Sequence, residues 1–134
     1  MIIGIPKETY NKETRVALFP TEIKQLSSNN IKFQVEKDAG LGAFISNQDY
    51  ENANAKIVTD VYLESDLIIH INPPSEIEIN KIRKEACLIS LINPFINHKL
   101  VKALAEKNIS TFCLELIPRT TYAQSMDVLS SQAT

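Results

Sequence analysis

Three short runs of apolar residues constrain the fold of this chain more than any other feature. They cover residues 2–5, 67–71 and 86–92, and each is followed at once by a proline or by an Asn-Pro pair. None of them alternates apolar with polar residues, as a strand with one face in water does. Continuous apolar strands of this length are typical of a parallel sheet that is covered on both faces.

The remaining segments complete an alternation of strands and helices. Further strands are predicted at residues 31–36, 55–58 and 110–116. Helices are predicted from Pro20 onward and at residues 47–54, 75–84 and 97–107, with one more helical turn at 60–64. Alternating strands and helices with short connections predict an α/β fold. We expect a doubly wound, mainly parallel sheet with helices on both faces, of the flavodoxin-like or Rossmann-like kind.

The glycines of the chain do not form a dinucleotide-binding fingerprint. Gly40 and Gly42 flank Leu41, but the position three residues after Gly42 is Ile45, where the fingerprint needs glycine or alanine. We therefore expect these glycines to form a turn.

Composition excludes several classes of function. The 134 residues fit one domain, and the net charge of −2 without a basic cluster argues against a nucleic-acid surface. No apolar run is long enough to cross a membrane, and the N-terminus does not have the pattern of a signal peptide. Cys87 and Cys113 lie in apolar strand-like runs, which favours two buried reduced thiols over a disulfide.

The sequence predicts neither a metal site nor self-contained covalent catalysis. His70 and His98 are the only histidines, and neither has ligand spacing to another histidine or cysteine. We interpret His70 as a core or rim residue and His98 as a residue at a helix start. No serine lies in a nucleophile elbow and neither cysteine has an evident base partner, so no catalytic residue is assigned.

Several polar residues follow predicted strand ends and are therefore expected on one rim of the sheet. Asn72, Asn93 and Arg119 occupy such positions, and ligands of doubly wound sheets bind at the carboxyl ends of the strands. Arg15, in the segment E-T-R-V-A, has two interpretations. It either ties down the first crossover loop or lines the same rim as Arg119.

A last helix is predicted near Tyr122, because Thr121 and Gln124 have capping-box spacing. At about 100° per residue, Gln124, Asp127 and Ser131 share one side of this helix, with Ser130 at its border. One interpretation is a solvated surface helix. The other is a group of side chains that, together with Arg119, grips a polar ligand carrying an amide and phosphates. This helix reaches the end of the chain, which suggests that the natural protein continues.

The motifs of the chain resemble one family. The run P-R-x-x-x-A-Q-S-M-D-x-L-S-S-Q, beginning at Pro118, is similar to the segment of the proton-translocating NAD(P) transhydrogenase alpha subunit that lies beside the nicotinamide of NAD(H). G-I-P-K-E-T, E-T-R-V-A and the Gly40–Gly42 turn also match the alanine dehydrogenase/transhydrogenase superfamily. One departure is Tyr122, where the family often has a second arginine.

The resemblance implies a function and a set of site residues. Arg119, Gln124, Asp127 and Ser130 would surround the nicotinamide of NAD(H) and its ribose. The family transfers hydride from NADH on this subunit to NADP on the NADP-binding domain of a beta subunit, coupled to proton translocation through membrane domains. The resemblance also implies a homodimer of the full-length subunit, attached peripherally to the cytoplasmic face of the bacterial inner membrane.

The resemblance further implies that residues 1–134 are the N-terminal domain of the alpha subunit. A glycine-rich Rossmann domain would follow and bind most of NAD, so we expect residues 1–134 alone to bind NAD(H) weakly or not at all.

Two alternatives remain. Alanine dehydrogenases, the other branch of the superfamily, hold pyruvate with an arginine at the position of Arg15 and with a lysine and a histidine on two rim loops. Here Asn72 and Asn93 occupy those loop positions and cannot titrate, so alanine oxidation is disfavoured. The other alternative is a free-standing α/β interaction module without a cofactor.

Overall fold

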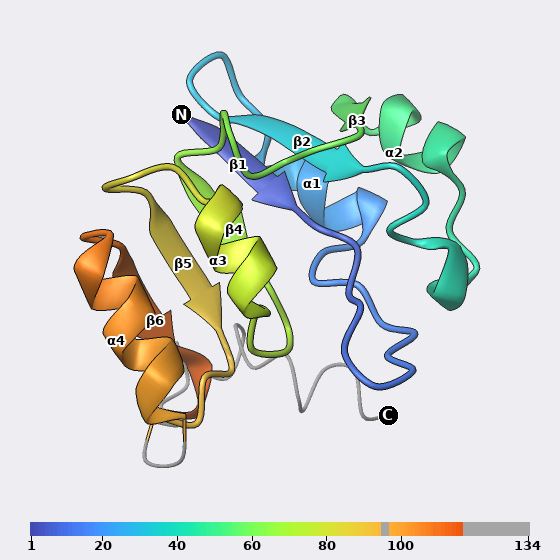
Figure 1. The fold of residues 1–134 in the computed structure, drawn as a ribbon. Helices are drawn as coiled ribbons and strands as arrows, with labels where there is room; N and C mark the ends of the chain where they lie inside the picture. The colour runs from blue at the N-terminus through green and yellow to red at the C-terminus, as the bar shows by residue number, and fades with distance from the viewer. Residues whose placement is uncertain (95–96, 117–134) are drawn as a thin grey trace.

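One sheet of six parallel strands forms the centre of the molecule (Figure 1). The computed structural model describes residues 1–94 and 97–116. The strands are β1 (Ile2–Ile5), β2 (Lys32–Glu36), β3 (Ala55–Val58), β4 (Leu67–Ile69), β5 (Cys87–Ser90) and β6 (Ser110–Cys113), in the spatial order β3-β2-β1-β4-β5-β6. This order is the Rossmann order, and it confirms the predicted doubly wound parallel sheet.

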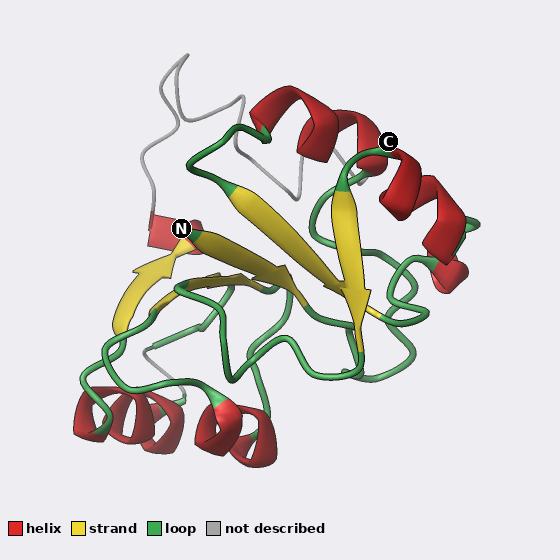
Figure 2. Cartoon of the chain, turned by 90° about the horizontal axis from the view of Figure 1, so that it is seen from above, coloured by secondary structure: helices red, strands yellow, loops and turns green. Residues whose placement is uncertain are grey.

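Helices cover both faces of the sheet, as Figure 2 shows. The helices are α1 (Pro20–Leu26), α2 (Asn47–Asn52), α3 (Glu76–Lys81) and α4 (His98–Glu106), with short 3-10 helices η1 (Leu41–Ala43) and η2 (Leu114–Leu116). The two faces of the sheet have separate hydrophobic cores, because successive residues of a strand point to opposite faces. Ile3 and Ile5 of β1 join one core cluster with Ile23 of α1 and Tyr50 of α2. On the other face, Ile68, Leu88, Ile79 and Leu104 join a second cluster with α3 and α4.

The helical turn expected at residues 60–64 is a hydrogen-bonded turn without a helix. The Asp60 carboxylate accepts a hydrogen bond from the Tyr62 backbone N–H at 2.8 Å, which holds the chain in a turn. Val61 and Tyr62 are then buried in the second core cluster. β3 and β4 are therefore joined by a compact loop, and this loop passes from one side of β1 to the other.

The glycine pair lies in a turn, as expected, but its role is close packing. No glycine among the described residues has a positive φ, and the left-handed position beside η1 belongs to Phe44, with a φ of 62°. A Cβ atom at Gly42 would lie 2.8 Å from the carbonyl oxygen of Thr14 and 3.0 Å from its Cα. Gly42 thus lets the E-T-R-V-A loop approach η1 closely.

Candidate functional site

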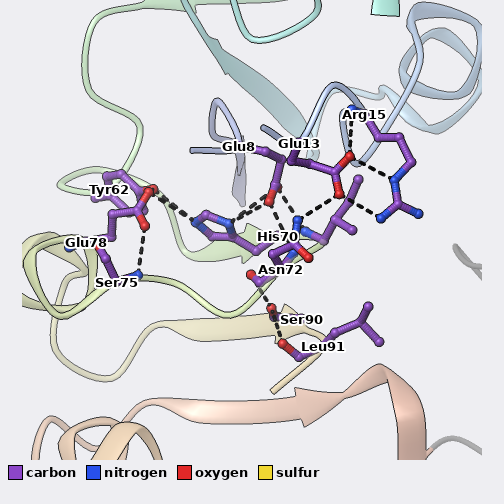
Figure 3. A network of polar contacts seen from close by, with 11 residues as sticks. Glu8, Glu13, Arg15, Tyr62, His70, Asn72, Ser75, Glu78, Ser90 and Leu91 are labelled. Atoms are coloured by element: carbon purple, nitrogen blue, oxygen red, sulfur yellow. Dashed lines mark hydrogen bonds and ion pairs between the residues drawn. The ribbon is translucent and has the colours of Figure 1, made fainter. Parts of the chain in front are cut away.

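The strand order reverses between β1 and β4, which makes the carboxyl ends of these two strands the switch point of the sheet. β1 connects toward β2 on one side, whereas β4 connects toward β5 on the other, so the loops that follow these two strands diverge. Ligands of open α/β sheets bind at such a switch point. Here the loops carry Glu8, Glu13, Arg15, His70 and Asn72, whose contacts Figure 3 shows.

The more exposed part of the switch point is an ion pair between Glu13 and Arg15 that an amide supports. The guanidinium of Arg15 donates to both carboxylate oxygens of Glu13, at 3.0 Å from Nε and 2.7 Å from the terminal nitrogen. The side-chain amide of Asn72 donates to the same carboxylate at 2.8 Å. These donors, led by Arg15, outweigh the effect of burial and lower the pKa of Glu13 to about 2. Glu13 therefore joins the loop after β1 to the loop after β4.

The buried part of the switch point holds the Glu8 carboxylate. Glu8 is 6% exposed, and its oxygens accept hydrogen bonds from the backbone N–H groups of Ile71 at 2.9 Å and Asn72 at 3.1 Å. Two successive backbone N–H groups at a strand end form an anion-binding concavity. In this protein the anion is one of the protein's own side chains.

The next strand end has the same arrangement with a different carboxylate. Glu115 of η2 accepts hydrogen bonds from the backbone N–H groups of Ile92 at 3.0 Å and Asn93 at 2.8 Å. Asn93 itself has a φ of 53°, in the left-handed region. The backbone amides after β4 and β5 are therefore both engaged by side chains of the chain itself, which leaves no phosphate cradle at either position.

The structure brings together some of the predicted rim residues and not others. Asn72 and Arg15 meet through Glu13, so Arg15 both ties down its loop and lies at the rim. Asn93 follows the next strand and makes its described contacts through its backbone. The predicted cofactor-binding residues lie outside the described residues, as does the predicted helix near Tyr122; they are Arg119, Gln124, Asp127 and Ser130.

The interpretations of the histidines agree with the structure, since His70 is 2% exposed at the rim and α4 begins at His98. Cys87 and Cys113 are free thiols, as predicted, but the prediction that they are buried is wrong, because both are partly exposed. Within residues 1–94 and 97–116 no group of acidic, histidine or cysteine side chains could hold a metal ion. In the same ranges no helix combines the length and apolar character that crossing a bilayer requires.

Sequence reasoning missed Glu8, Glu13 and Glu115. Glu8 and Glu13 lie in a polar segment, where an acidic residue is usually solvated. Glu115 falls in the strand predicted at residues 110–116, but β6 ends at Cys113 and Glu115 lies in η2. One signal was present for Glu8, since it follows a buried strand by three residues and so reaches the carboxyl edge. Its backbone partners are more than sixty positions away in the sequence, so local pattern could not identify them.

Known proteins similar to this chain come from the superfamily that its motifs resemble. The chain is 37% identical to the NAD(P) transhydrogenase subunit alpha of Haemophilus influenzae, covering 99% of this chain and 26% of that protein. It is 34% identical to the alanine dehydrogenase of Bacillus subtilis, covering 87% of this chain and 32% of that enzyme. The chain thus spans about a quarter to a third of the length of these curated relatives.

A solved structure and a family model give the same result. The crystal structure of the transhydrogenase from Sinorhizobium meliloti superposes with a TM-score of 0.91 and 41% identity, covering 99% of this chain and 40% of that chain. The family model described as "Alanine dehydrogenase/PNT, N-terminal domain" matches residues 4–134. The fold, the motifs and these matches agree, and the chain belongs to the alanine dehydrogenase/PNT N-terminal domain family.

Proposed function

We propose that this chain is the N-terminal α/β domain of an NAD(P) transhydrogenase alpha subunit and that its rim contributes the nicotinamide-side contacts to an NAD(H) site. The residues proposed to make these contacts are Arg119, Gln124, Asp127 and Ser130. The proposal extends to hydride transfer between NADH and NADP, coupled to proton translocation. It rests on the similarity to transhydrogenase alpha subunits and on one feature of the rim.

That feature is the engagement of Arg15 by Glu13. An amino-acid dehydrogenase needs a free cation to hold the substrate carboxylate and a titrating group to accept the proton of the amine. The Arg15 charge is paired with a carboxylate whose pKa is about 2, so Glu13 stays ionised at neutral pH. Asn72 completes this ion pair and cannot titrate. Glu13 and Arg15 belong to the E-T-R-V-A motif that both branches share, so it is Asn72 at this ion pair that favours the transhydrogenase branch over alanine oxidation.

The rim fits the nicotinamide half of the cofactor better than the pyrophosphate half. Glu8 and Glu115 fill the backbone concavities after β4 and β5, and their negative charges repel phosphate. We infer that the pyrophosphate is held by a second, glycine-rich Rossmann domain after residue 134. NADP(H) would be bound by a beta subunit, and the full-length subunit would form a homodimer at the cytoplasmic face of the membrane.

Direct hydride transfer requires position more than acid–base chemistry. Two nicotinamide rings react when they are held face to face in a near-attack geometry with water excluded. The protein's share of that task is a rigid support with polar groups that fix the carboxamide and the ribose. The loops after β4 and β5 are suited to be such a support, because the carboxylates of Glu8 and Glu115 accept hydrogen bonds from their backbone amides.

Calorimetric titration with NADH tests the proposal on two proteins, the 134-residue chain and the full-length gene product. We expect binding by the full-length protein and little or none by the chain alone. In the full-length protein, Gln124→Ala or Asp127→Ala should weaken binding about tenfold or more, as expected for loss of one buried polar contact. Lys102→Ala, an exposed change on α4, is the matched control and should leave binding unchanged.

The same proteins separate the alternatives. Reduction of an NADP analogue by NADH in the presence of the beta subunit supports the transhydrogenase assignment. Alanine-dependent reduction of NAD without it would overturn that assignment in favour of an alanine dehydrogenase. A full-length protein that binds no NADH would instead favour an interaction module.

A further inference from the structure

Three buried side chains and one partly buried carboxylate form a continuous series of contacts behind the rim. Glu8 follows β1, His70 follows β4, Tyr62 lies in the turn between β3 and β4, and Glu78 lies on α3 (Figure 3). His70 is 2% exposed and Tyr62 3%. The imidazole therefore sits between a carboxylate on one side and a phenol linked to a second carboxylate on the other.

The contacts of Glu78 fix the direction of the hydroxyl proton of Tyr62. One Glu78 oxygen accepts the backbone N–H of Ser75 at 2.8 Å, and the other accepts the Tyr62 hydroxyl at 2.8 Å. Burial raises the pKa of Glu78, but these hydrogen bonds bring it below its ordinary value, so the carboxyl is ionised. Since the Tyr62 proton points at Glu78, the Tyr62 oxygen must accept from Nε2 of His70, which lies 3.0 Å away.

The Glu8 end requires a second proton on the imidazole. Both Glu8 oxygens already accept backbone N–H groups, from Ile71 and Asn72. Nδ1 of His70 lies 3.3 Å from one of these oxygens and 3.4 Å from the other. An unprotonated Nδ1 would direct its lone pair at a buried carboxylate, which is strongly unfavourable.

A count of protons leads to the same result. The three contacts Glu8–His70, His70–Tyr62 and Tyr62–Glu78 each need one proton. Tyr62 supplies one and a neutral imidazole supplies one, so one more is required. We propose that His70 is held as an imidazolium, and that its two N–H groups tie the loop after β4 to Glu8 on one side and to Tyr62 and Glu78 on the other.

The charges around the network favour the cation. Glu8 and Glu78 face the imidazole from two sides. Glu36, at the end of β2, adds a third acidic group near Tyr62, and its own pKa is raised, chiefly by burial. The opposing cations are Lys81, which acts on Glu36, and Arg15, which acts on Glu8 and is already paired with Glu13. Two carboxylates thus face the imidazolium, and a third acidic group lies near its tyrosine partner.

The second proton has a structural consequence for the loop after β4, which carries Asn72. A neutral imidazole can hold a proton on Nδ1, which faces Glu8, or on Nε2, which faces Tyr62, but not on both. Loss of one proton would therefore break the contact of this loop either with Glu8 or with Tyr62. This consequence holds whether or not the proposed cofactor function is correct.

Nuclear magnetic resonance of the histidine side chains tests this directly. The 134-residue protein is labelled with 15N-histidine, and long-range proton–nitrogen spectra are recorded from about pH 6 to about pH 9. The protein has two histidines, and His98, exposed at the start of α4, provides the reference titration in the same spectra. We expect both ring nitrogens of His70 to keep the shifts of protonated nitrogens at about pH 8. A single protonated nitrogen at about pH 7 would overturn the proposal.

Tyr62→Phe is the matched control variant. It keeps the ring but removes the acceptor for Nε2, so only the Nδ1–Glu8 contact needs a proton, and a neutral imidazole can supply it. We expect this variant to show the neutral Nδ1–H tautomer at about pH 8. If the ring nitrogens of His70 have the same shifts at about pH 8 in Tyr62→Phe and in the unmodified protein, the proposal that Tyr62 requires a proton on Nε2 is wrong.

Urea unfolding provides a second measurement. The additional proton is bound in the folded chain but not by an unfolded histidine above pH about 6.5. The folding equilibrium constant should therefore fall about tenfold for each pH unit above about pH 7, relative to Tyr62→Phe. Equal slopes for the two proteins would refute the proposal. If Tyr62→Phe does not fold, the spectra of the unmodified protein decide alone.

Discussion

Replacement of Glu13 by glutamine tests whether the ion pair at the rim is a structural tie between two loops. The carboxylate accepts two hydrogen bonds from the Arg15 guanidinium, one from the Arg15 backbone N–H and one from Asn72. The ion pair, with the Arg15 hydrogen bond as its largest component, lowers the Glu13 pKa from 4.5 to about 2. At about 1.36 kcal/mol per unit, a difference of about 2.5 units sets an upper limit of about 3.4 kcal/mol.

The expected effect is smaller because water reaches part of the ion pair. The Glu13 side chain is 11% exposed but that of Arg15 is 32% exposed, and solvent screens a pair of this kind. Glutamine also keeps one acceptor oxygen for Asn72. We therefore expect Glu13→Gln to lower the free energy of unfolding by roughly 1–2 kcal/mol at about pH 7.

The pH dependence gives the prediction a definite sign. The Glu13 pKa is lower in the folded chain, so its contribution is complete above pH about 4.5 and is lost as the pH falls through about 2. Urea unfolding followed by circular dichroism measures the difference at about pH 7 and at about pH 2. Glu51→Gln, an exposed change on α2, is the control. Equal unfolding midpoints for Glu13→Gln and the unmodified protein at about pH 7, or a difference that persists at about pH 2, would refute the reasoning.

Two further predictions concern the packing that supports the rim loops. Gly42→Ala places a Cβ atom 2.8 Å from the Thr14 carbonyl oxygen, and because backbone must move to relieve the clash, we expect a loss of roughly 1–3 kcal/mol, measured as a lower thermal midpoint. An unchanged thermal midpoint would show that the loop containing Thr14 can move away from residue 42 without loss of stability. Tyr50→Phe removes the 2.7 Å hydrogen bond from the buried hydroxyl to the Leu18 carbonyl and should cost about 1–2 kcal/mol in urea unfolding, whereas no change would mean that water replaces it.

The sequence predicted the sheet because its strands are buried on both faces. A strand such as Cys87–Ser90 between two others needs apolar residues on each side, and that requirement leaves a continuous run that is visible locally. The ends of the strands were harder to predict. The run at residues 67–71 suggested a five-residue strand, but β4 ends at Ile69 because the Ile71 amide is held by Glu8.

The candidate site was only partly predictable, for a related reason. Asn72 and Arg15 were assigned to the rim from their positions after β4 and in the first crossover, and both lie there. The carboxylates that organise them act over long sequence separations, so no periodicity marks them. His70 shows the same limit, because its place after an apolar strand predicts burial but not contacts with Tyr62 and Glu8.

Glu8 and Glu115 close two anion positions that a Rossmann-order sheet offers at its carboxyl edge. Each carboxylate accepts the two backbone N–H groups that follow a strand, and such groups would otherwise attract a phosphate. The loops after β4 and β5 are thereby fixed without a ligand, and neither offers an anion site. A rim of this kind is suited to neutral polar groups, such as a carboxamide or a ribose. That is the part of the cofactor we propose for this domain, with the charged part bound by another domain.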